Sequence, residues 1–287
     1  MHTLQPYRQI SHKITTLLIV LLAWCTLSTP AFSKPNTRVT APTEVELRLN
    51  QSHQALQLRY PTTVRLEQVL QDTLANLHQL PADHSGRPLY WFGSTLWRSD
   101  GITRKAMKRQ QSAVIQQLQQ LALHWQNSQP ETSHSLQVLA KSLSTPLPGQ
   151  RIFQPLDLDW VRIAPNKNPG LNGQFMLQVI TRPETVKVFA ALSQPNMTDG
   201  EITIPWQERN NATDYLQQVT PLTISHKDYL WVIQPDGNTE QHEIAYWNRN
   251  HKDIAPGATL YLPLTSLPDG YESLNHDIVN LLKQRPF

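Results

Sequence analysis

The chain has 287 residues, of which 39% are hydrophobic and only 16% are charged, so it can form a core and has room for two small domains. The formal net charge is +3. Without the first 33 residues, which carry Arg8, Lys13 and no acidic residue, 23 basic residues face 22 acidic ones and the balance is +1. A nearly neutral protein lacks the concentrated positive field of a nucleic-acid-binding protein.

The N-terminal segment predicts export. Two basic residues precede an apolar run at residues 14–27, and Ala31 and Ser33 place small side chains at the −3 and −1 positions of a cleavage site before Lys34. The apolar run is shorter than the ~20 residues that a membrane span needs. We therefore expect residues 1–33 to be a cleavable signal peptide rather than a retained anchor.

Cleavage would also remove Cys25, the only cysteine. Trp24 stands where a lipidated cysteine requires a small residue, so a lipoprotein is not expected. The mature chain would then hold no disulfide, no thiol nucleophile and no thiolate metal site.

The first half of the mature chain predicts a hairpin, a helix and a strand. Residues 45–49 and 56–60 alternate between apolar and polar side chains on either side of a polar turn. Residues 66–77 have one apolar helical face, and residues 89–97 favour another strand. Hairpin, helix and strand is the order of a β-grasp unit, which we expect within residues 34–173.

A helical hairpin is expected as an insertion in this unit, at about residues 103–144. Residues 103–125 predict a helix whose apolar stripe is interrupted only by Gln111, Pro130 is expected to end it, and residues 135–143 predict a second helix. The stripe of the longer helix consists of Met107, Val114, Leu118, Leu121 and Trp125. Two short stripes bury little between themselves, so we expect the hairpin to lean on the sheet.

The same order of elements is expected again within residues 174–270, which predicts a second β-grasp unit. The expected elements are a hairpin of residues 175–180 and 185–192, a strand at 202–204, a helix at 211–219 and a second hairpin within 229–247. Pro235 and Gly237 have the φ preferences that close the second hairpin. The repeat lies in the order of elements, because no sequence period is visible.

The C-terminal segment, residues 271–287, predicts an amphipathic helix from about residue 273 to 285. It follows a short strand expected at residues 259–262, and its apolar stripe consists of Leu274, Ile278, Leu281 and Leu282. This stripe could pack on the second domain, or dock on a partner or on the outer membrane. We expect packing, because apolar stripes of this size are usually covered within the molecule.

Five stretches together resemble a known family. They are DLDWVRIAPNKNPGL, YLWVIQPDG, AYWNR, PGATLYLPL and LNHDIVNLLKQRP, in this order along the chain. In sequence and spacing they resemble the periplasmic capsule-biosynthesis GfcC family. The resemblance implies two β-grasp domains, the first with a helical insertion, and a terminal amphipathic helix. It also implies a periplasmic accessory protein of capsule or exopolysaccharide assembly and export, whose partner is a polysaccharide or an export protein.

No catalytic or cofactor motif is recognisable. The chain has no Gly-rich phosphate loop, no GxSxG elbow and no HExxH pair, so no cofactor, no metal and no catalytic residue is expected. His124, His226, His242 and His251 lack the close spacing of metal ligands.

Asp157 and Asp159 are the nearest approach to a catalytic pair. On a strand they would point to the same face, where they could hold a metal or flank a sugar bond in a polysaccharide-processing enzyme. The alternative, which we favour, is that they are turn and cap residues. Besides a binding protein and a processing enzyme, the chain could also be a structural adaptor without a ligand.

A basic patch is expected at the start of the long helix, at Arg104, Lys105, Lys108 and Arg109. Cations there oppose the helix dipole, which slightly favours an anionic partner. A solvated helix face is the more common role of such a run.

Four residues are candidates for ligand binding: Arg151, Arg162, Trp91 and Trp206. Both arginines lie where the insertion rejoins the sheet, where we expect a cleft, and the guanidinium fork suits carboxylates and phosphates. For Arg162 we favour the alternative that it pairs with Asp157 or Asp159. We expect the two tryptophans to stack on sugars, and Trp125 and Trp231 to belong to the core.

Overall fold

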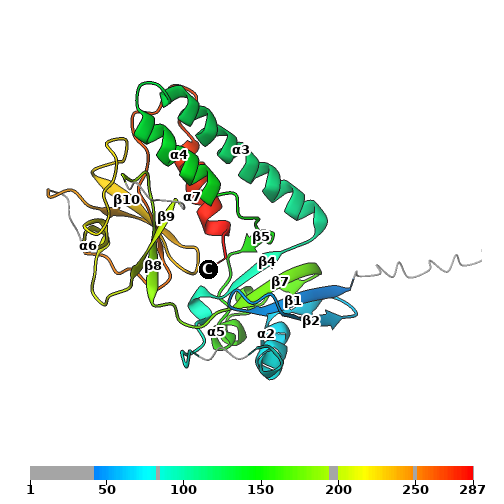
Figure 1. The fold of residues 1–287 in the computed structure, drawn as a ribbon. Helices are drawn as coiled ribbons and strands as arrows, with labels where there is room; N and C mark the ends of the chain where they lie inside the picture. The colour runs from blue at the N-terminus through cyan, green and yellow to red at the C-terminus, as the bar shows by residue number, and fades with distance from the viewer. Residues whose placement is uncertain (1–41, 82–84, 194–199, 248–250, 287) are drawn as a thin grey trace, which may run out of the picture. The chain divides into compact units, whose positions relative to one another are not determined.

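The computed structural model describes residues 42–81, 85–193, 200–247 and 251–286, so the expected signal peptide at residues 1–33 lies outside the described part. The described residues form an α+β fold with two mixed sheets of five strands each and several helices (Figure 1). Of the helices in these ranges, none combines the length and the hydropathy that crossing a membrane requires.

The first sheet has the order β2-β1-β7-β4-β5. Its strands are β1 (Thr43–Leu49), β2 (Ala55–Tyr60), β4 (Thr95–Arg98), β5 (Gln150–Ile152) and β7 (Gly173–Val179). β1 and β2 form the predicted antiparallel hairpin, and β7 runs parallel to β1 and antiparallel to β4. The predicted helix is α2 (Leu66–Asn76), whose Leu66, Val69 and Leu70 share a buried cluster with the sheet. One face of this sheet is therefore covered by α2.

The predicted hairpin of residues 175–180 and 185–192 is wrong. β7 lies in the centre of the first sheet, whereas β8 (Thr185–Phe189) belongs to the second sheet. Five consecutive residues at the end of β7 are buried, as a strand covered on both faces requires. The pattern of apolar residues does not reveal which strand a segment pairs with, and proximity in sequence favoured the wrong partner. A domain boundary at residue 173 would divide the first sheet.

The predicted strand at residues 89–97 begins only at Thr95, because the 3-10 helix η2 (Trp91–Gly93) precedes it. A Cβ atom on Gly93 would lie 2.7 Å from Cδ1 of Ile180, so this turn packs closely on the end of β7. The remaining elements of this half are β3 (Val64–Arg65), η1 (Leu77–Gln79), α5 (Leu158–Ile163), η3 (Pro165–Lys167) and β6 (Gly170–Leu171).

The second sheet has the order β11-β10-β12-β8-β9. Its other strands are β9 (Glu201–Pro205), β10 (Tyr229–Ile233), β11 (Thr239–Glu243) and β12 (Thr259–Tyr261), and α6 (Ala212–Leu216) lies between β9 and β10 in the chain. The predicted hairpin of β10 and β11 is confirmed. If the strands of each sheet are counted along the chain, both sheets have the order 2-1-5-3-4.

The predicted helical hairpin is confirmed and consists of α3 (Gly101–Trp125) and α4 (Pro130–Ser142). Pro130 does not merely end the first helix: it is the first residue of the second, where its missing N–H costs nothing. Gln111, which interrupts the apolar stripe, is buried and donates to the carbonyl oxygens of Leu143 (2.6 Å) and Thr145 (2.7 Å). The polar residue in the stripe therefore closes the hairpin.

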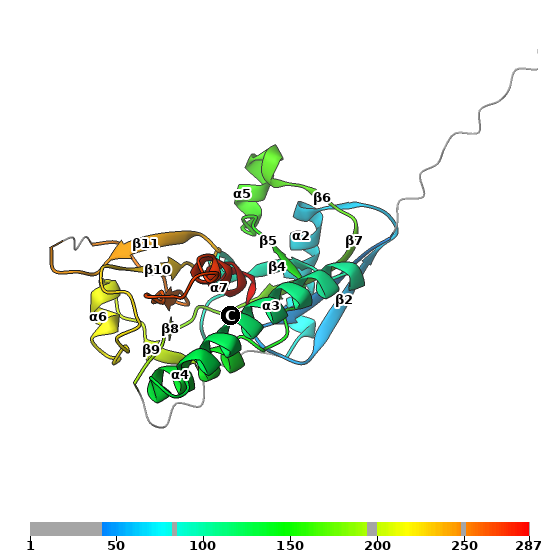
Figure 2. The same cartoon turned by 90° about the horizontal axis from the view of Figure 1, so that it is seen from above.

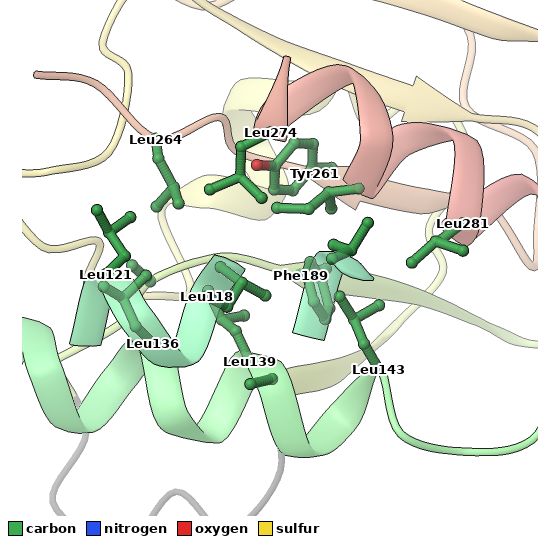
Figure 3. Close-up of a cluster of buried hydrophobic side chains, with 14 of the residues drawn as sticks. Leu118, Leu121, Leu136, Leu139, Leu143, Phe189, Tyr261, Leu264, Leu274 and Leu281 are labelled. Carbon is green, nitrogen blue, oxygen red and sulfur yellow. The ribbon is translucent and has the colours of Figure 1, made fainter. Parts of the chain in front are cut away.

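The terminal helix α7 (Leu274–Gln284) packs between the helical hairpin and the second sheet (Figures 1 and 2). All four residues of its apolar stripe are buried in a cluster with residues of α3, α4, β8 and β12 (Figure 3), which confirms the expectation of packing. Trp125 belongs to this cluster and the half-buried Trp231 packs against it.

The helical hairpin leans on the second sheet rather than on the sheet into which it is inserted. Its inner residues share the buried cluster with Phe189 and Tyr261 of the second sheet (Figure 3). The hydroxyl of Ser135 accepts a hydrogen bond from the backbone N–H of Leu192 (3.0 Å). The insertion therefore joins the two halves of the chain around α7.

The end of α7 is held by polar contacts. Its Gln284 carbonyl accepts from Nε1 of Trp97 in the first sheet (3.0 Å). Nη1 of Arg285 lies 2.6 Å from the carboxylate of Glu201, which also pairs with Lys187 (3.2 Å). Burial alone would raise the pKa of Glu201, but Arg285 and Lys187 outweigh it and hold that pKa below its ordinary value.

We expect Glu201→Gln to lower the free energy of unfolding by about 2 kcal/mol at pH 7, because charge-assisted hydrogen bonds are lost. A depressed carboxyl pKa stabilises the fold above the unfolded value of about 4.3, and this contribution disappears as the pH falls through the folded value. Urea unfolding should therefore separate the variant from the natural protein at pH 7 and much less at pH 3. Glu208→Gln, at an exposed position, is the control. An equal difference at both pH values would contradict the assignment.

Candidate functional site

A cleft of about 830 Å³ opens where segments from both halves of the chain meet. Four aromatic side chains line it: Trp91, Phe92, Phe153 and Trp160. Five charged side chains also line it: Arg151, Asp157, Lys167, Asp236 and Lys283. They come from η2, from β5 and the segment after it, from α5 and η3, from the turn between β10 and β11, and from the end of α7.

Arg151 of β5 is the buried cation of the cleft, with only 5% of its surface exposed. Its Nη2 donates to the carbonyl of Pro235 in the β10–β11 turn, and its Nη1 donates to the carbonyl of Lys283 in α7 (3.2 Å). Its backbone N–H donates to Oε1 of Gln284 (2.6 Å). One side chain thus connects the first sheet, the second sheet and the terminal helix.

The charge of Arg151 is perturbed but retained. Burial lowers the pKa of its guanidinium to about 10, and the negative charge of Asp236 partly opposes this shift. At neutral pH a group with this pKa stays protonated, so the cleft has a permanent cation at its base. Because the side chain is buried and bonded to two other segments, alanine at position 151 is expected to destabilise the fold.

Phe153 forms a flat wall beside Arg151. Cζ of Arg151 lies 5.4 Å from the ring centroid and Nζ of Lys283 lies 5.0 Å from it, both within the range of cation–π attraction. Gly237 in the turn has φ +89°, and a Cβ atom there would lie 2.4 Å from Cε1 of Phe153. The turn therefore needs glycine both for its backbone conformation and for the close approach of this ring.

Asp157 and Asp159 do not form a pair on a strand. Asp157 is the N-cap of α5, and its carboxylate accepts from the backbone N–H groups of Asp159 (2.9 Å) and Trp160 (3.2 Å). This confirms the alternative of a cap residue. Only Asp157 of the two lines the cleft, since Asp159 lies in the exposed first turn of α5.

Of the other candidates, Trp91 lines the cleft and is half-buried there. Arg162 lies outside it and pairs with Glu67 of α2 (3.3 Å), so the predicted pairing with Asp157 or Asp159 is wrong. Helix α5 turns the Arg162 side chain towards Glu67 of α2, so it does not lie beside the aspartates.

Trp206 also lies outside the cleft. Its Nε1 donates to the carbonyl of Ile254 (2.8 Å), and the guanidinium of Arg182 lies 5.2 Å from its ring. The ring face and the polar edge both have protein partners, so Trp206 is not presented as an open stacking surface.

The basic patch of Arg104, Lys105, Lys108 and Arg109 lies on the exposed N-terminal part of α3, and none of its residues lines this cleft. No residue of the helical hairpin lines the cleft, although the sequence suggested that the insertion would form one side of it. The β10–β11 turn and the end of α7 provide that side instead.

Several residues of the cleft were missed from sequence. Trp160 is 59% exposed. Its position three residues after the cap residue Asp157 could have indicated that it lines the same cleft, because a cap residue and the first turn of its helix lie at the same end of the helix. Phe153 follows Arg151 by two residues, which places both side chains on the same face of an extended segment. Lys167, Asp236 and Lys283 had no local signal.

The arrangement suits recognition of a polar ligand with flat apolar faces. Aromatic rings offer stacking surfaces, and charged groups of both signs offer hydrogen bonds to hydroxyl and carboxylate groups. In the described ranges, no group of three or more His, Asp, Glu or Cys side chains is arranged to hold a metal ion.

Comparison with known proteins places both halves of the chain in one group of sequences. Residues 44–182 match the family described as "Capsule biosynthesis GfcC, N-terminal", and residues 200–286 match "Capsule biosynthesis GfcC C-terminal". The chain is also similar to the "Uncharacterized protein YjbG" of Escherichia coli (strain K12), at 30% identity over 201 residues, which cover 68% of this chain and 76% of that protein.

Proposed function

Because the chain belongs to the capsule biosynthesis GfcC family, we propose that it is a periplasmic accessory protein of capsule or exopolysaccharide assembly and export. It acts by binding rather than by catalysis, and its ligand is a segment of polysaccharide. The observation that carries the proposal is the cleft around Arg151, where four aromatic and five charged side chains meet. A protein of the export complex is the alternative partner.

The composition of the cleft supports a sugar ligand. Trp160 is 59% exposed, so its face is accessible to the apolar face of a sugar ring. Phe153, whose ring is contacted by Arg151 and Lys283, adds an apolar wall beside it. Lys167 and Lys283 line the same cleft and can bind the carboxylates of an acidic polymer. Ligand sites commonly combine apolar walls with a few convergent polar groups in this way.

The motifs that resemble the family support a shared role for the cleft. Asp157, Trp160 and Lys167 belong to the stretch DLDWVRIAPNKNPGL, Asp236 to YLWVIQPDG and Lys283 to LNHDIVNLLKQRP. These stretches are far apart in sequence, yet each contributes side chains to the same cleft.

The proposal includes two β-grasp domains. In each sheet, a first hairpin is followed by a helix, and the last strand lies between the first hairpin and a second pair of strands. The first strand of each sheet is parallel to the last. The helical hairpin is then an insertion between the third and fourth strands of the first domain.

The proposed periplasmic location requires export. We expect the intact mass of the protein isolated from the periplasm to correspond to a chain that begins at Lys34, because Ala31 and Ser33 suit signal peptidase. A product of full-length mass, or one that carries lipid, would contradict this expectation.

The binding role can be tested with an acidic oligosaccharide, such as a decamer of galacturonic acid, by titration calorimetry. We expect Trp160→Ala to weaken binding by roughly 2- to 12-fold, the range expected for loss of one aromatic contact. Trp247→Ala is the matched control, because Trp247 is 76% exposed but lies outside the cleft. Both variants should unfold at the same temperature as the natural protein.

The outcomes separate the three interpretations. Binding that depends on Trp160 supports the proposed function. Release of shorter products from the oligosaccharide would favour a processing enzyme, to be checked with Asp157→Ala and Asp159→Ala. Absence of any carbohydrate binding, together with capture of export proteins alone, would favour a structural adaptor.

A further inference from the structure

A second hollow, of about 450 Å³, lies over the face of the first sheet that α2 does not cover. Neighbouring strands place two rows of side chains on this face: Arg48, Gln178 and Thr95 in one, and Glu46, Met176 and Trp97 in the other. The first two residues of each row line the hollow. The β1–β2 turn, the Pro146–Pro148 linker and Arg104 of α3 form its walls. We call this hollow the α3 groove.

The floor of the α3 groove is polar. Gln178 is 3% exposed, and its amide nitrogen donates to the carbonyl of Asn50 (2.6 Å). Its amide oxygen has no hydrogen-bond partner among the described residues. Buried polar atoms are normally paired, so this floor has unused capacity that the hydroxyl groups of a ligand could satisfy.

Arg104 is positioned over the α3 groove by the helix itself. It precedes the buried residues Met107 and Gln111 by three and seven positions, so it lies on the same stripe of the helix. At this end of α3 the core has ended, and the side chain lines the groove instead. No ion pair within the described ranges involves Arg104.

The charge at the α3 groove favours an anion. Arg48 and Glu46 both line it and pair with each other, so Arg104 is the uncompensated charge. Asp100 lies at the start of the helix, but its carboxylate is bound to the N–H and the hydroxyl of Thr103. The rest of the basic patch adds a positive field on the same helix end.

We propose that the α3 groove is a second carbohydrate site, which binds an anionic segment of a glycan. Arg104 binds a carboxylate of the chain, and the polar floor binds its hydroxyl groups. The choice of an acidic glycan as the anion rests on the proposed function. This assignment gives the basic patch a specific role, in which Arg104 makes the contact and the other three residues contribute only to the field.

The α3 groove and the cleft both reach the C-terminal end of α7. Lys283 lines the cleft, and Pro286 lines the groove. Three residues span at most about 10 Å, so the two sites have neighbouring edges. A long glycan can therefore occupy both, and its affinity gains from the second contact because that contact is intramolecular. A short glycan can occupy only one site at a time.

The test compares a trimer and a decamer of galacturonic acid by titration calorimetry. We expect Arg104→Ala to weaken binding of the decamer by about tenfold, as loss of one charge-assisted hydrogen bond predicts. The matched control is Lys105→Ala, which removes the same charge from the same helical turn at a residue that does not line the groove. It should change decamer affinity by less than about twofold, since exposed charges contribute little.

The outcomes distinguish the groove from the cleft. An equal loss in Arg104→Ala and Lys105→Ala would overturn the proposal, because it would indicate a diffuse field. A decamer that responds to Trp160→Ala but not to Arg104→Ala would also overturn it while leaving the cleft as the carbohydrate site. If the decamer does not bind at all, the proposed function fails together with the groove. Binding of phosphatidylglycerol vesicles that requires Arg104, without an effect on glycans, would replace the glycan by a lipid.

Discussion

Truncation of the chain after Leu267 is expected to abolish cooperative folding of the described domain. It removes α7, whose Leu274, Ile278, Leu281 and Leu282 are at most 5% exposed. Burial of four such side chains contributes about 6–12 kcal/mol, which is comparable to the whole stability of a typical domain, about 5–15 kcal/mol. The loss would also expose the inner surfaces of the helical hairpin and the second sheet, which α7 covers (Figure 3).

The measurement is thermal unfolding followed by near-ultraviolet circular dichroism, together with binding of a hydrophobic dye. We expect the truncated chain to lose its sharp transition and to bind the dye. A graded version keeps the chain complete: Leu281→Ala should cost about 2–5 kcal/mol, and Asn280→Ala, at an exposed position of the same helix, should be nearly neutral. A truncated chain with an unchanged transition would show that α7 is dispensable for folding and would favour a docking role.

Arg151→Ala is expected to lower the free energy of unfolding by about 3–5 kcal/mol. The substitution leaves the carbonyl groups of Pro235 and Lys283 without their guanidinium donor, and a buried carbonyl without a partner costs about 1–3 kcal/mol. It also removes the packing of the arginine against Phe153. The effect is large because one side chain connects segments that are 84 and 132 positions away in sequence.

Two further variants test this interpretation by chemical denaturation. Arg151→Lys keeps the charge but cannot reach both carbonyls with a planar fork, so it should recover only part of the loss. Arg59→Ala, at an exposed arginine of β2, should change stability by less than about 1 kcal/mol. If Arg151→Ala unfolds like the natural protein, the connection through this residue does not stabilise the fold, and a ligand-binding role alone would remain.

The truncation after Leu267 and the Arg151→Ala substitution also limit what a binding experiment on the cleft can show. Because Arg151 has a structural role, loss of capsule or exopolysaccharide output in Arg151→Ala would not by itself locate a ligand. Trp160 is the better probe, since it is 59% exposed and lies on the rim formed by α5. Contact of α7 with the outer membrane would require the helix to leave its buried position. Because truncation also disrupts the fold, loss of membrane contact in the truncated chain would not by itself show that α7 binds the membrane.

The sequence indicated only some residues of the candidate site. Arg151 and Trp91 were candidates for ligand binding, one because it follows a linker and the other because it stands beside Phe92 and Gly93, and both line the cleft. Trp206 and Arg162 had the same residue types in similar settings, yet the structure gives them partners at Ile254 and Glu67. Residue type and local setting do not indicate what a side chain meets across the fold.

Local patterns were sufficient for most elements of the fold. The alternation in β1 and β2, the stripes of α2, α3 and α7 and the turn at Pro235 and Gly237 each depend on residues within a few positions of one another. Such patterns reflect the geometry of a single helix, strand or turn, which the chain expresses without reference to its tertiary neighbours.

The sequence by itself determined which faces are apolar, where most of the longer helices lie, and that the chain resembles this family. Only the tertiary structure decided what covers those faces. It placed β7 between β1 and β4, set α7 between the helical hairpin and the second sheet, and brought Arg151 to the carbonyl of Pro235. The physical reason is that periodicity specifies a surface to be buried, whereas the partner that buries it is selected by the summed packing of segments far apart in the chain.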